Sequence, residues 1–407
     1  MNPRNSHQRW KWITGAGLVG AGLFAFVSTT LSAPRSKQEA LYDQVELLAE
    51  AISVIQTEYV EPVEPKRLIY GALKGLVESL DRHSQFMDPE AYSEMQVETK
   101  GEFGGVGLEI TLSRDGVLTV VTPMDDTPAA KAGLKPNDRI VKIDGESTRG
   151  VSLHDAVMKL RGRPGSQVKL SILREDENRV FEVSLARSVI QIRSIKSARS
   201  ADGRIDYVRI SEFQDNTFRD LVKALEGVDR EGMEGLILDL RNNPGGLLDV
   251  AVDVAGQFIP KGEMVVYTKG RMESQNQQFR SAQEKPHLGF PMVILVNGGS
   301  ASASEIVAGA LRDHGRAILM GTKTFGKGSV QTVIPLRDGS AIRLTTSIYY
   351  TPSGQAIHGK GLNPDVVVED EPRPETETFS PFRDPLVLRA VDLLKGLRIY
   401  QEKKPSP

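Results

Sequence analysis

The sequence predicts a multidomain protein of mixed α/β class, because its hydrophobic periodicity changes twice along the 407 residues. Residues 37–95 carry apolar side chains at the three- and four-residue spacing of helices, and residues 101–187 contain short β-like runs. From residue 190 onward, strands alternate with helices, which is typical of a layered α/β domain. At about 150 residues per domain, the length favours two or three domains.

The composition excludes several classes of protein. Hydrophobic residues make up 39% and charged residues 26%, which excludes a mostly disordered, collagen-like or multi-span membrane protein. With 51 Lys+Arg against 53 Asp+Glu, the net charge is −2, so we expect no nucleic-acid partner. The absence of cysteine excludes disulfides, thiolate metal sites, a cysteine nucleophile and CxxC redox chemistry.

Residues 1–33 are predicted to be a signal peptide or a membrane anchor. Residues 1–11 are basic, and residues 13–31 form an uncharged apolar stretch. A cleavage site can follow Ala33, but Pro34 comes next and Leu31 is larger than usual at such sites, so an uncleaved anchor remains open. In either case we expect export to the periplasm or the outer face of the cytoplasmic membrane, with membrane contact only through this segment.

Residues 34–96 are predicted to form a helical region for packing or dimerisation, with a second helix near residues 66–80. Pro62 and Pro65 separate the two helices. Asp81, His83 and Ser84 are the chemistry of a serine triad, but three neighbours on one turn cannot form a relay. We therefore interpret them as a cap.

Residues 97–187 are predicted to form a ligand-binding β domain, with strands near residues 106–112, 117–121, 139–143, 168–173 and 179–185 and a helix at 153–160. A glycine loop precedes the first strand. Its free backbone amides can bind a carboxylate, and the edge of the strand can pair with an extended peptide. The loop consists of Gly104, Gly105, Val106, Gly107 and Leu108. Residues 127–134 and 137–145 resemble the signature of a PDZ domain. Asn137 stands where that family more often has Gly, so we expect a positive φ there. A structural β domain without a ligand is the alternative.

Residues 188–368 are predicted to form the α/β domain, and residues 369–407 a linker followed by a helix. The expected strands lie at residues 205–210, 235–240 and 292–296, and the expected helices at 218–225, 248–258 and 304–312. Residues 369–378 are acidic and proline-rich, and a last helix at 385–401 is expected to dock on the body.

Two strand-to-helix turns are candidates for the chemistry, because active sites of α/β domains collect at strand carboxyl ends. The first contains Gly245 and Gly246, which can aim backbone amides at a developing negative charge. The second contains Ser302 at the mouth of a helix, where a serine is placed to attack a carbonyl. Spacing alone favours another role, because Ser302 and Glu305 fit the Ser-x-x-Glu capping box.

A nucleophilic serine needs a base, and Lys327 is the strongest candidate. None of the six histidines lies on a strand-end turn with an obvious carboxylate to orient it, and His314 at a helix end is explained by capping. Lys327 lies between two glycines before an apolar strand, where burial can lower its pKa from about 10.4. Gln331 can orient the amine without adding charge, provided that the Gly-Lys-Gly segment turns back. A phosphate-binding loop is disfavoured, because the full pattern is absent.

These residues together resemble the serine-lysine core of the carboxyl-terminal processing proteases, also called tail-specific proteases, of serine peptidase family S41. The resemblance rests on three alternating serines at residues 300–304, Lys327 25 residues after Ser302, and Gln331. It implies that Ser302 is the nucleophile, Lys327 the general base and Gln331 its orienter. It further implies a crotonase-like α/β core, no metal or other cofactor, and an oxyanion hole built from the amide of Ala303 and one of Gly245 or Gly246.

The resemblance also implies a function. We expect an exported serine endopeptidase that captures disordered, apolar protein C-termini on its PDZ domain and cleaves through an acyl-enzyme. A homodimer through the helical ends and an activator or adaptor protein are the other expected partners. Arg161, after the PDZ helix, is a regulatory candidate that would link tail binding to catalysis. Two alternatives stay open: an inactive tail-binding adaptor, and a Ser/His/Asp hydrolase using His314 or His358.

Overall fold

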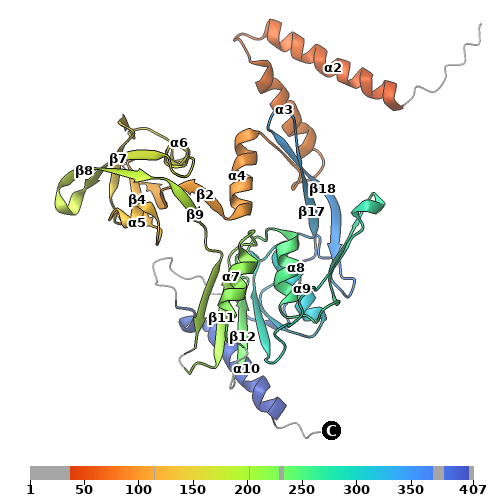
Figure 1. Ribbon diagram of the computed structural model, residues 1–407. Helices are drawn as coiled ribbons and strands as arrows, with labels where there is room; N and C mark the ends of the chain where they lie inside the picture. The colour runs from red at the N-terminus through yellow and green to blue at the C-terminus, as the bar shows by residue number, and fades with distance from the viewer. Residues whose placement is uncertain (1–36, 114, 201, 229–232, 370–379, 403–407) are drawn as a thin grey trace, which may run out of the picture. The chain divides into compact units, whose positions relative to one another are not determined.

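The computed structural model describes residues 37–113, 115–200, 202–228, 233–369 and 380–402 (Figure 1). The predicted export segment therefore lies outside the described residues, as does nearly all of the predicted linker. The chain divides into two compact units, residues 1–75 and 76–407. Within the described residues, no helix combines the length and the apolarity needed to cross a membrane.

The N-terminal helices are α2 (Lys37–Glu58) and α3 (Pro65–Glu78), separated at the two prolines as predicted. Along α2, the apolar residues Leu41, Val45 and Leu48 are exposed. The expectation of continuous helical pattern to residue 95 was wrong in part, because a short strand interrupts it. That strand, β1 (Gln85–Met87), pairs with a strand more than 250 residues later and is followed by α4 (Pro89–Lys100).

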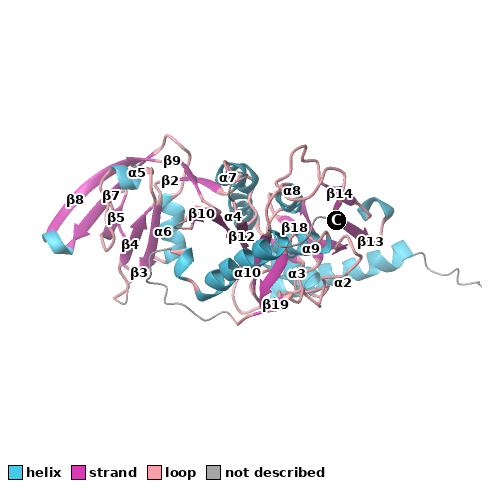
Figure 2. Ribbon diagram, turned by 90° about the horizontal axis from the view of Figure 1, so that it is seen from below, coloured by secondary structure: helices cyan, strands magenta, loops and turns pink. Residues whose placement is uncertain are grey.

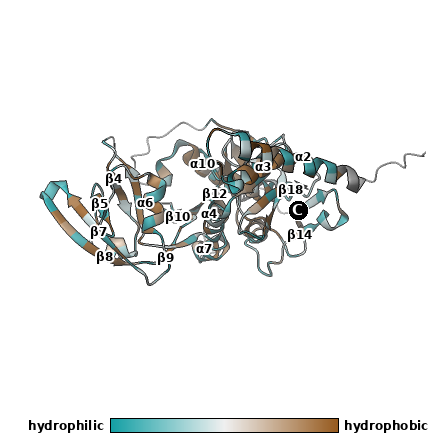
Figure 3. Cartoon of the chain, turned by 90° about the horizontal axis from the view of Figure 1, so that it is seen from above, coloured by the Kyte–Doolittle hydropathy of each residue, from teal (hydrophilic) through white to brown (hydrophobic). Residues whose placement is uncertain are grey.

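The segment after α4 forms a six-stranded antiparallel sheet of order β3-β4-β5-β7-β8, with β6 added to β5. Its apolar core lies between the sheet and α6, and Figure 3 shows hydrophobic and hydrophilic residues alternating along β7 and β8. The strands β2 and β9, which precede and follow the strands of this sheet in the chain, pair with each other in a separate two-stranded sheet. The elements are β2 (Glu102–Gly105), β3 (Leu108–Leu112), β4 (Leu118–Pro123), α5 (Pro128–Lys131), β5 (Arg139–Ile143), β6 (Glu146–Ser147), α6 (Leu153–Leu160), β7 (Gln167–Arg174), β8 (Arg179–Ala186) and β9 (Ser188–Gln191).

The C-terminal part is built on a second six-stranded sheet, of order β10-β11-β12-β15-β16-β19. Within this sheet, β11, β12, β15, β16 and β19 are parallel to one another, and β10 pairs antiparallel with β11 at the edge. A separate five-stranded antiparallel sheet has the order β1-β18-β13-β14, with β17 paired to β18. Residues of its strands line the candidate site described below. The strands are β10 (Ile195–Arg199), β11 (Ile205–Ile210), β12 (Gly235–Asp239), β13 (Met264–Gly270), β14 (Gln278–Arg280), β15 (Met292–Val296), β16 (Ile318–Gly321), β17 (Ser329–Pro335), β18 (Ala341–Tyr350) and β19 (Val366–Val367).

Helices cover both faces of the parallel sheet, as buried parallel strands require. One face packs against α7 (Thr217–Ala224), α8 (Leu248–Gly256) and α9 (Ala303–Asp313). The other face packs against α10 (Pro385–Glu402), which runs along β12 and β15 (Figures 1 and 2). The predicted α/β multidomain class and the docking of the last helix are confirmed. Every helix and strand predicted in this region lies within two residues of its observed bounds, whereas the strands of the antiparallel sheet were not predicted.

Candidate active site

The turns after β12 and β15 lie side by side, because these two strands are parallel neighbours. Several hydrogen bonds join them. The Asn242 amide donates to Asn297 Oδ1 (2.9 Å), and the Asn243 carbonyl accepts from the Ala301 amide (2.9 Å) and the Ser304 hydroxyl (3.0 Å). The two turns therefore form one polar unit at the carboxyl ends of the strands, where the sequence placed both candidate turns.

Ser302 immediately precedes α9 in an unusual backbone conformation, with φ 56° and ψ −115°. Positive φ is uncommon for a residue with a side chain and is concentrated at functional sites. The hydroxyl makes no capping hydrogen bond to the helix backbone. The capping-box arrangement with Glu305 is present, and the Ser302 amide donates to Glu305 Oε2 (3.0 Å). The box therefore forms, but no capping hydrogen bond holds the Ser302 hydroxyl.

Glu305 connects the serine segment to the lysine segment. Its fully buried carboxylate accepts from the Ser302 amide (3.0 Å) and the Lys327 amide (2.9 Å) at Oε2. At Oε1 it accepts from the Gly326 amide (2.8 Å) and the Thr324 hydroxyl. Burial raises the pKa of Glu305, and these hydrogen bonds oppose the rise. The capping-box spacing could have revealed the contact with Ser302, but nothing in the sequence pointed to the contact with Lys327.

Lys327 and Ser302 line the same cavity, which has a volume of about 620 Å³. Burial lowers the pKa of the Lys327 amine, and the positive charge of Arg343 lowers it further. No ion pair to Lys327 is present within the part of the chain that the structure describes. The environment thus favours the neutral amine, which is the form that can accept a proton.

Gln331 lines the same cavity, but its side chain is held by another residue. Its amide nitrogen donates to the carbonyl (3.1 Å) and the hydroxyl (2.8 Å) of Ser329. Gly326 has φ 91°, and β17 begins only at Ser329, so Lys327 belongs to the turn before the strand. The predicted turning of this segment brings both side chains to one cavity, without a hydrogen bond between them.

The backbone amides expected to form the oxyanion hole differ in their availability. The Gly245 amide donates to Asn243 Oδ1 (2.9 Å), whereas the amides of Ala303 and Gly246 donate to no described residue. Gly245 adjoins the serine closely, since a Cβ there would lie 2.7 Å from Ser302 Cβ and 3.0 Å from the Ala303 nitrogen. Of the two glycines, Gly246 therefore has the free donor, and Gly245 provides the close approach.

Comparisons with known proteins show the family of the chain. The model of peptidase family S41 matches residues 204–368, that of the PDZ domain residues 119–174, and that of the activating protease CtpB N-terminal domain residues 22–91. The carboxy-terminal-processing protease of Bartonella bacilliformis is 42% identical over 362 residues, covering 87% of this chain and 82% of that protein. The chain belongs to the carboxyl-terminal processing proteases of peptidase family S41.

A second sequence relative and a solved structure are also similar to this protease. The carboxy-terminal processing protease CtpB of Bacillus subtilis is 34% identical, and the alignment covers 92% of this chain and 78% of that protein. A solved structure of an S41 protease from Bacteroides fragilis has the same fold at 18% identity, with a TM-score of 0.51 over 85% of this chain and 97% of that one. The predictions of a serine peptidase and of a PDZ domain are confirmed.

None of the described histidines lines the cavity that contains Ser302. His314 ends α9, and its Nε2 lies 2.7 Å from the Met264 carbonyl oxygen of β13, so its ring binds another element where capping of its own helix was expected. His358 packs against His83, with ring centroids 6.3 Å apart. Asp81 accepts from the His83 amide (2.7 Å), which closes a turn after α3 where the sequence predicted a cap. No histidine lines the cavity, and within the described residues no group of His, Asp and Glu is arranged to hold a metal ion.

The PDZ domain of the protease has its own groove, a cavity of about 180 Å³ beside β3 and α6. Of the predicted glycine loop, all but Gly104 line it; Gly104 pairs with Val189 of β9 instead. Arg161 also lines the groove, with its guanidinium carbon 4.9 Å from the centre of the Phe103 ring. Its Nε is buried without a hydrogen-bond partner among the described residues. Asn137 has the expected positive φ, 70°.

Proposed function

We propose that this protease cleaves proteins with disordered, apolar C-termini, using Ser302 as nucleophile and Lys327 as general base. One observation carries the proposal: a serine whose hydroxyl makes no capping hydrogen bond lines the same cavity as a lysine whose pKa is lowered by burial and by Arg343, not raised by a carboxylate. A neutral amine beside a serine hydroxyl is what a serine-lysine mechanism requires.

In the proposed reaction, Lys327 Nζ accepts the hydroxyl proton as Ser302 Oγ bonds to the substrate carbonyl carbon. The resulting oxyanion is stabilised by the amides of Ala303 and Gly246, the two donors without partners among the described residues. Lys327 then passes the proton to the leaving amine, and the peptide C–N bond breaks to give the acyl-enzyme. Water loses a proton to Lys327 and attacks the ester, and the serine recovers its proton as the product acid leaves.

We assign three further roles on the same basis. Gln331 orients the amine of Lys327 after exchanging its Ser329 contacts, which its place in the cavity allows. The PDZ groove takes the substrate's C-terminus, since its apolar lining and loop amides suit an apolar residue ending in a carboxylate. Arg161, which lines that groove, links binding of the substrate's C-terminus in the groove to catalysis at Ser302.

The remaining features of the proposal concern export, partners and domain bounds. The basic and apolar stretches of residues 1–33 favour export, with the body in the periplasm or at the outer face of the membrane. The exposed apolar residues of α2 favour a homodimer, and an activator or adaptor protein is a further candidate partner. We assign residues 97–187 to the PDZ domain and 188–368 to a crotonase-like protease core.

The test compares the purified chain with its Ser302→Ala and Lys327→Ala variants. Each is incubated with a protein that ends in an apolar disordered tail, and with the same protein ending in two aspartates. We expect cleavage only by the wild type, and faster cleavage of the apolar tail. Cleavage by Ser302→Ala would exclude the nucleophile, whereas tail binding without cleavage by any form would support an adaptor. His314→Ala is the control, and loss of activity there with Lys327→Ala active would overturn the choice of base.

A further inference from the structure

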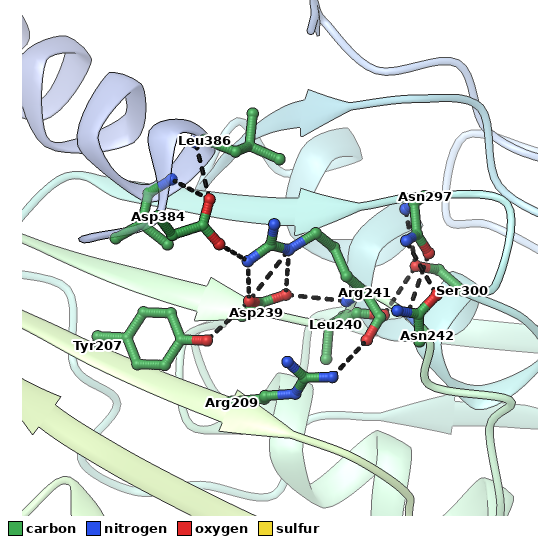
Figure 4. A network of polar contacts seen from close by, with 11 residues as sticks. Tyr207, Arg209, Asp239, Leu240, Arg241, Asn242, Asn297, Ser300, Asp384 and Leu386 are labelled. Carbon is green, nitrogen blue, oxygen red and sulfur yellow. Dashed lines mark hydrogen bonds and ion pairs between the residues drawn. The ribbon is translucent and has the colours of Figure 1, made fainter. Parts of the chain in front are cut away.

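The C-terminal helix is tied to the glycine turn of the active site by a buried ionic network (Figure 4). Arg241 follows β12 by two residues, and its guanidinium lies between two carboxylates. It donates to Asp239 Oδ2 (Nη2, 2.7 Å) and to Asp384 Oδ2 (Nη2, 2.5 Å). The exposed fractions are 0% for Asp239, 5% for Arg241 and 2% for Asp384, so solvent does not screen the network. The Tyr207 hydroxyl donates to Asp239 (2.7 Å) and fixes it from the neighbouring strand.

Asp384 makes a second set of contacts with its other oxygen. Its Oδ1 accepts from the Leu386 amide (2.8 Å) and the Val387 amide (3.4 Å), while Pro385 begins α10. Asp384 is therefore the N-cap of this helix, with proline at the first helical position. One carboxylate thus caps α10 and holds the guanidinium of Arg241, which lies 143 residues earlier in the chain.

Arg241 is directly followed by the turn that adjoins the serine. Asn242 has φ 56° and is bonded to Asn297 through its amide. The Leu240 carbonyl, on the other side of Arg241, accepts from the Ser300 hydroxyl (2.7 Å). Any displacement of the Arg241 backbone therefore reaches both the nucleophile turn and Gly246, five residues onward.

We propose that Asp384 is a positioning residue of the protease: by holding Arg241, the start of the C-terminal helix fixes the turn that aims the Gly246 amide at the oxyanion. This inference rests on the proposed function, since it concerns the same oxyanion hole. Packing alone does not account for the contact, because α10 already buries Leu386, Val387, Ala390 and Leu394 against the sheet. The charged contact adds a defined register between the helix and the turn.

The test separates the cap from the tether. Asp384→Ser keeps a good N-cap residue but is too short to reach Arg241, whereas Leu394→Ala, farther along the same helix, removes buried packing and leaves both contacts. For Asp384→Ser we expect kcat to fall about 10- to 100-fold, somewhat less than the 10²- to 10³-fold cost of deleting one oxyanion donor. KM should stay within about twofold. Leu394→Ala should lower the melting temperature but keep kcat near the wild-type value.

A second readout does not depend on turnover. A peptide boronate that forms a tetrahedral adduct with the serine should bind Asp384→Ser more weakly by the same factor as kcat. Unchanged kcat and boronate affinity in Asp384→Ser would overturn the inference, as would losses that merely follow melting temperature in both variants. Should Asp384→Ser fail to fold, Asp384→Asn replaces it, because one amide oxygen cannot both cap the helix and accept from Arg241. If Ser302→Ala retains wild-type activity, the proposed function fails instead.

Discussion

Replacing Glu305 by Gln tests whether one carboxylate positions both the proposed nucleophile, Ser302, and the proposed base, Lys327. The two oxygens of Glu305 accept four hydrogen bonds, from the amides of Ser302, Gly326 and Lys327 and from the Thr324 hydroxyl. A glutamine at this position has one oxygen and one NH₂ group. Whichever way it is oriented, its NH₂ group faces two donors that the carboxylate satisfied.

The size of the effect follows from this count. A buried donor left without an acceptor costs about 1–3 kcal/mol, so two should lower the free energy of unfolding by about 2–6 kcal/mol. A typical stability of about 5–15 kcal/mol leaves most such variants folded. The effect on kcat should be about 100-fold, because a displacement of about 1 Å in a reacting group costs that much.

The assay measures kcat, KM and denaturant unfolding for Glu305→Gln and for Thr324→Val as a matched control. Thr324→Val also removes a buried hydrogen bond to Glu305, but it leaves the contacts with Ser302 and Lys327 in place. We expect both variants to lose stability and only Glu305→Gln to lose most of its kcat. A Glu305→Gln variant that is destabilised yet retains kcat within twofold of the wild type would refute the reasoning.

Three other substitutions test separate parts of the site. Arg343→Gln removes a positive charge that lowers the pKa of Lys327, so that pKa should rise and the acidic limb of the pH profile of kcat/KM should move to higher pH; an unchanged limb would contradict this assignment. Gly245→Ala places a Cβ 2.7 Å from Ser302 Cβ at a residue with φ 109°, so kcat should fall at least about 100-fold, and wild-type turnover would show that the turn can move aside. Arg161→Ala should reduce cleavage of a tailed protein while leaving peptide binding, measured by fluorescence anisotropy, unchanged; undiminished cleavage would remove Arg161 from the regulatory role.

The parts of the fold that the sequence predicts well are those stabilised by their own pattern of apolar residues. The strand at Met292–Val296 and the helix at Leu153–Leu160 were predicted with their exact bounds, because one is a continuous buried run and the other is clearly amphipathic. By contrast, β18 (Ala341–Tyr350) has no clean alternation of buried and exposed residues. Its stability comes from pairing with β1, β13 and β17, which are distant in sequence or irregular in register.

The candidate site divides along the same line. Ser302 and Lys327 can be named from the sequence because their motifs are local and their chemistry is distinctive. The contact between Arg241 and Asp384 could not be predicted from the sequence, because the two residues are 143 positions apart and neither belongs to a recognisable motif. The choice between Gly245 and Gly246 also needed the structure, because it depends on which amide Asn243 already occupies.

If Lys327 is the base, as we propose, the placement of Glu305 resolves a conflict that any lysine base faces. A base must be held in place, and a carboxylate is the strongest partner for a lysine, but a carboxylate in contact with the ammonium group would keep it protonated. Here the Glu305 carboxylate accepts from the backbone amide of Lys327 and not from its ammonium group. Burial and the charge of Arg343 both lower the pKa of the Lys327 side chain, which favours the neutral amine. The charge of Glu305 is meanwhile compensated by four neutral donors. Position and protonation are thus controlled by different groups, which is why substitutions at Glu305 and Arg343 should affect kcat and the pH profile separately.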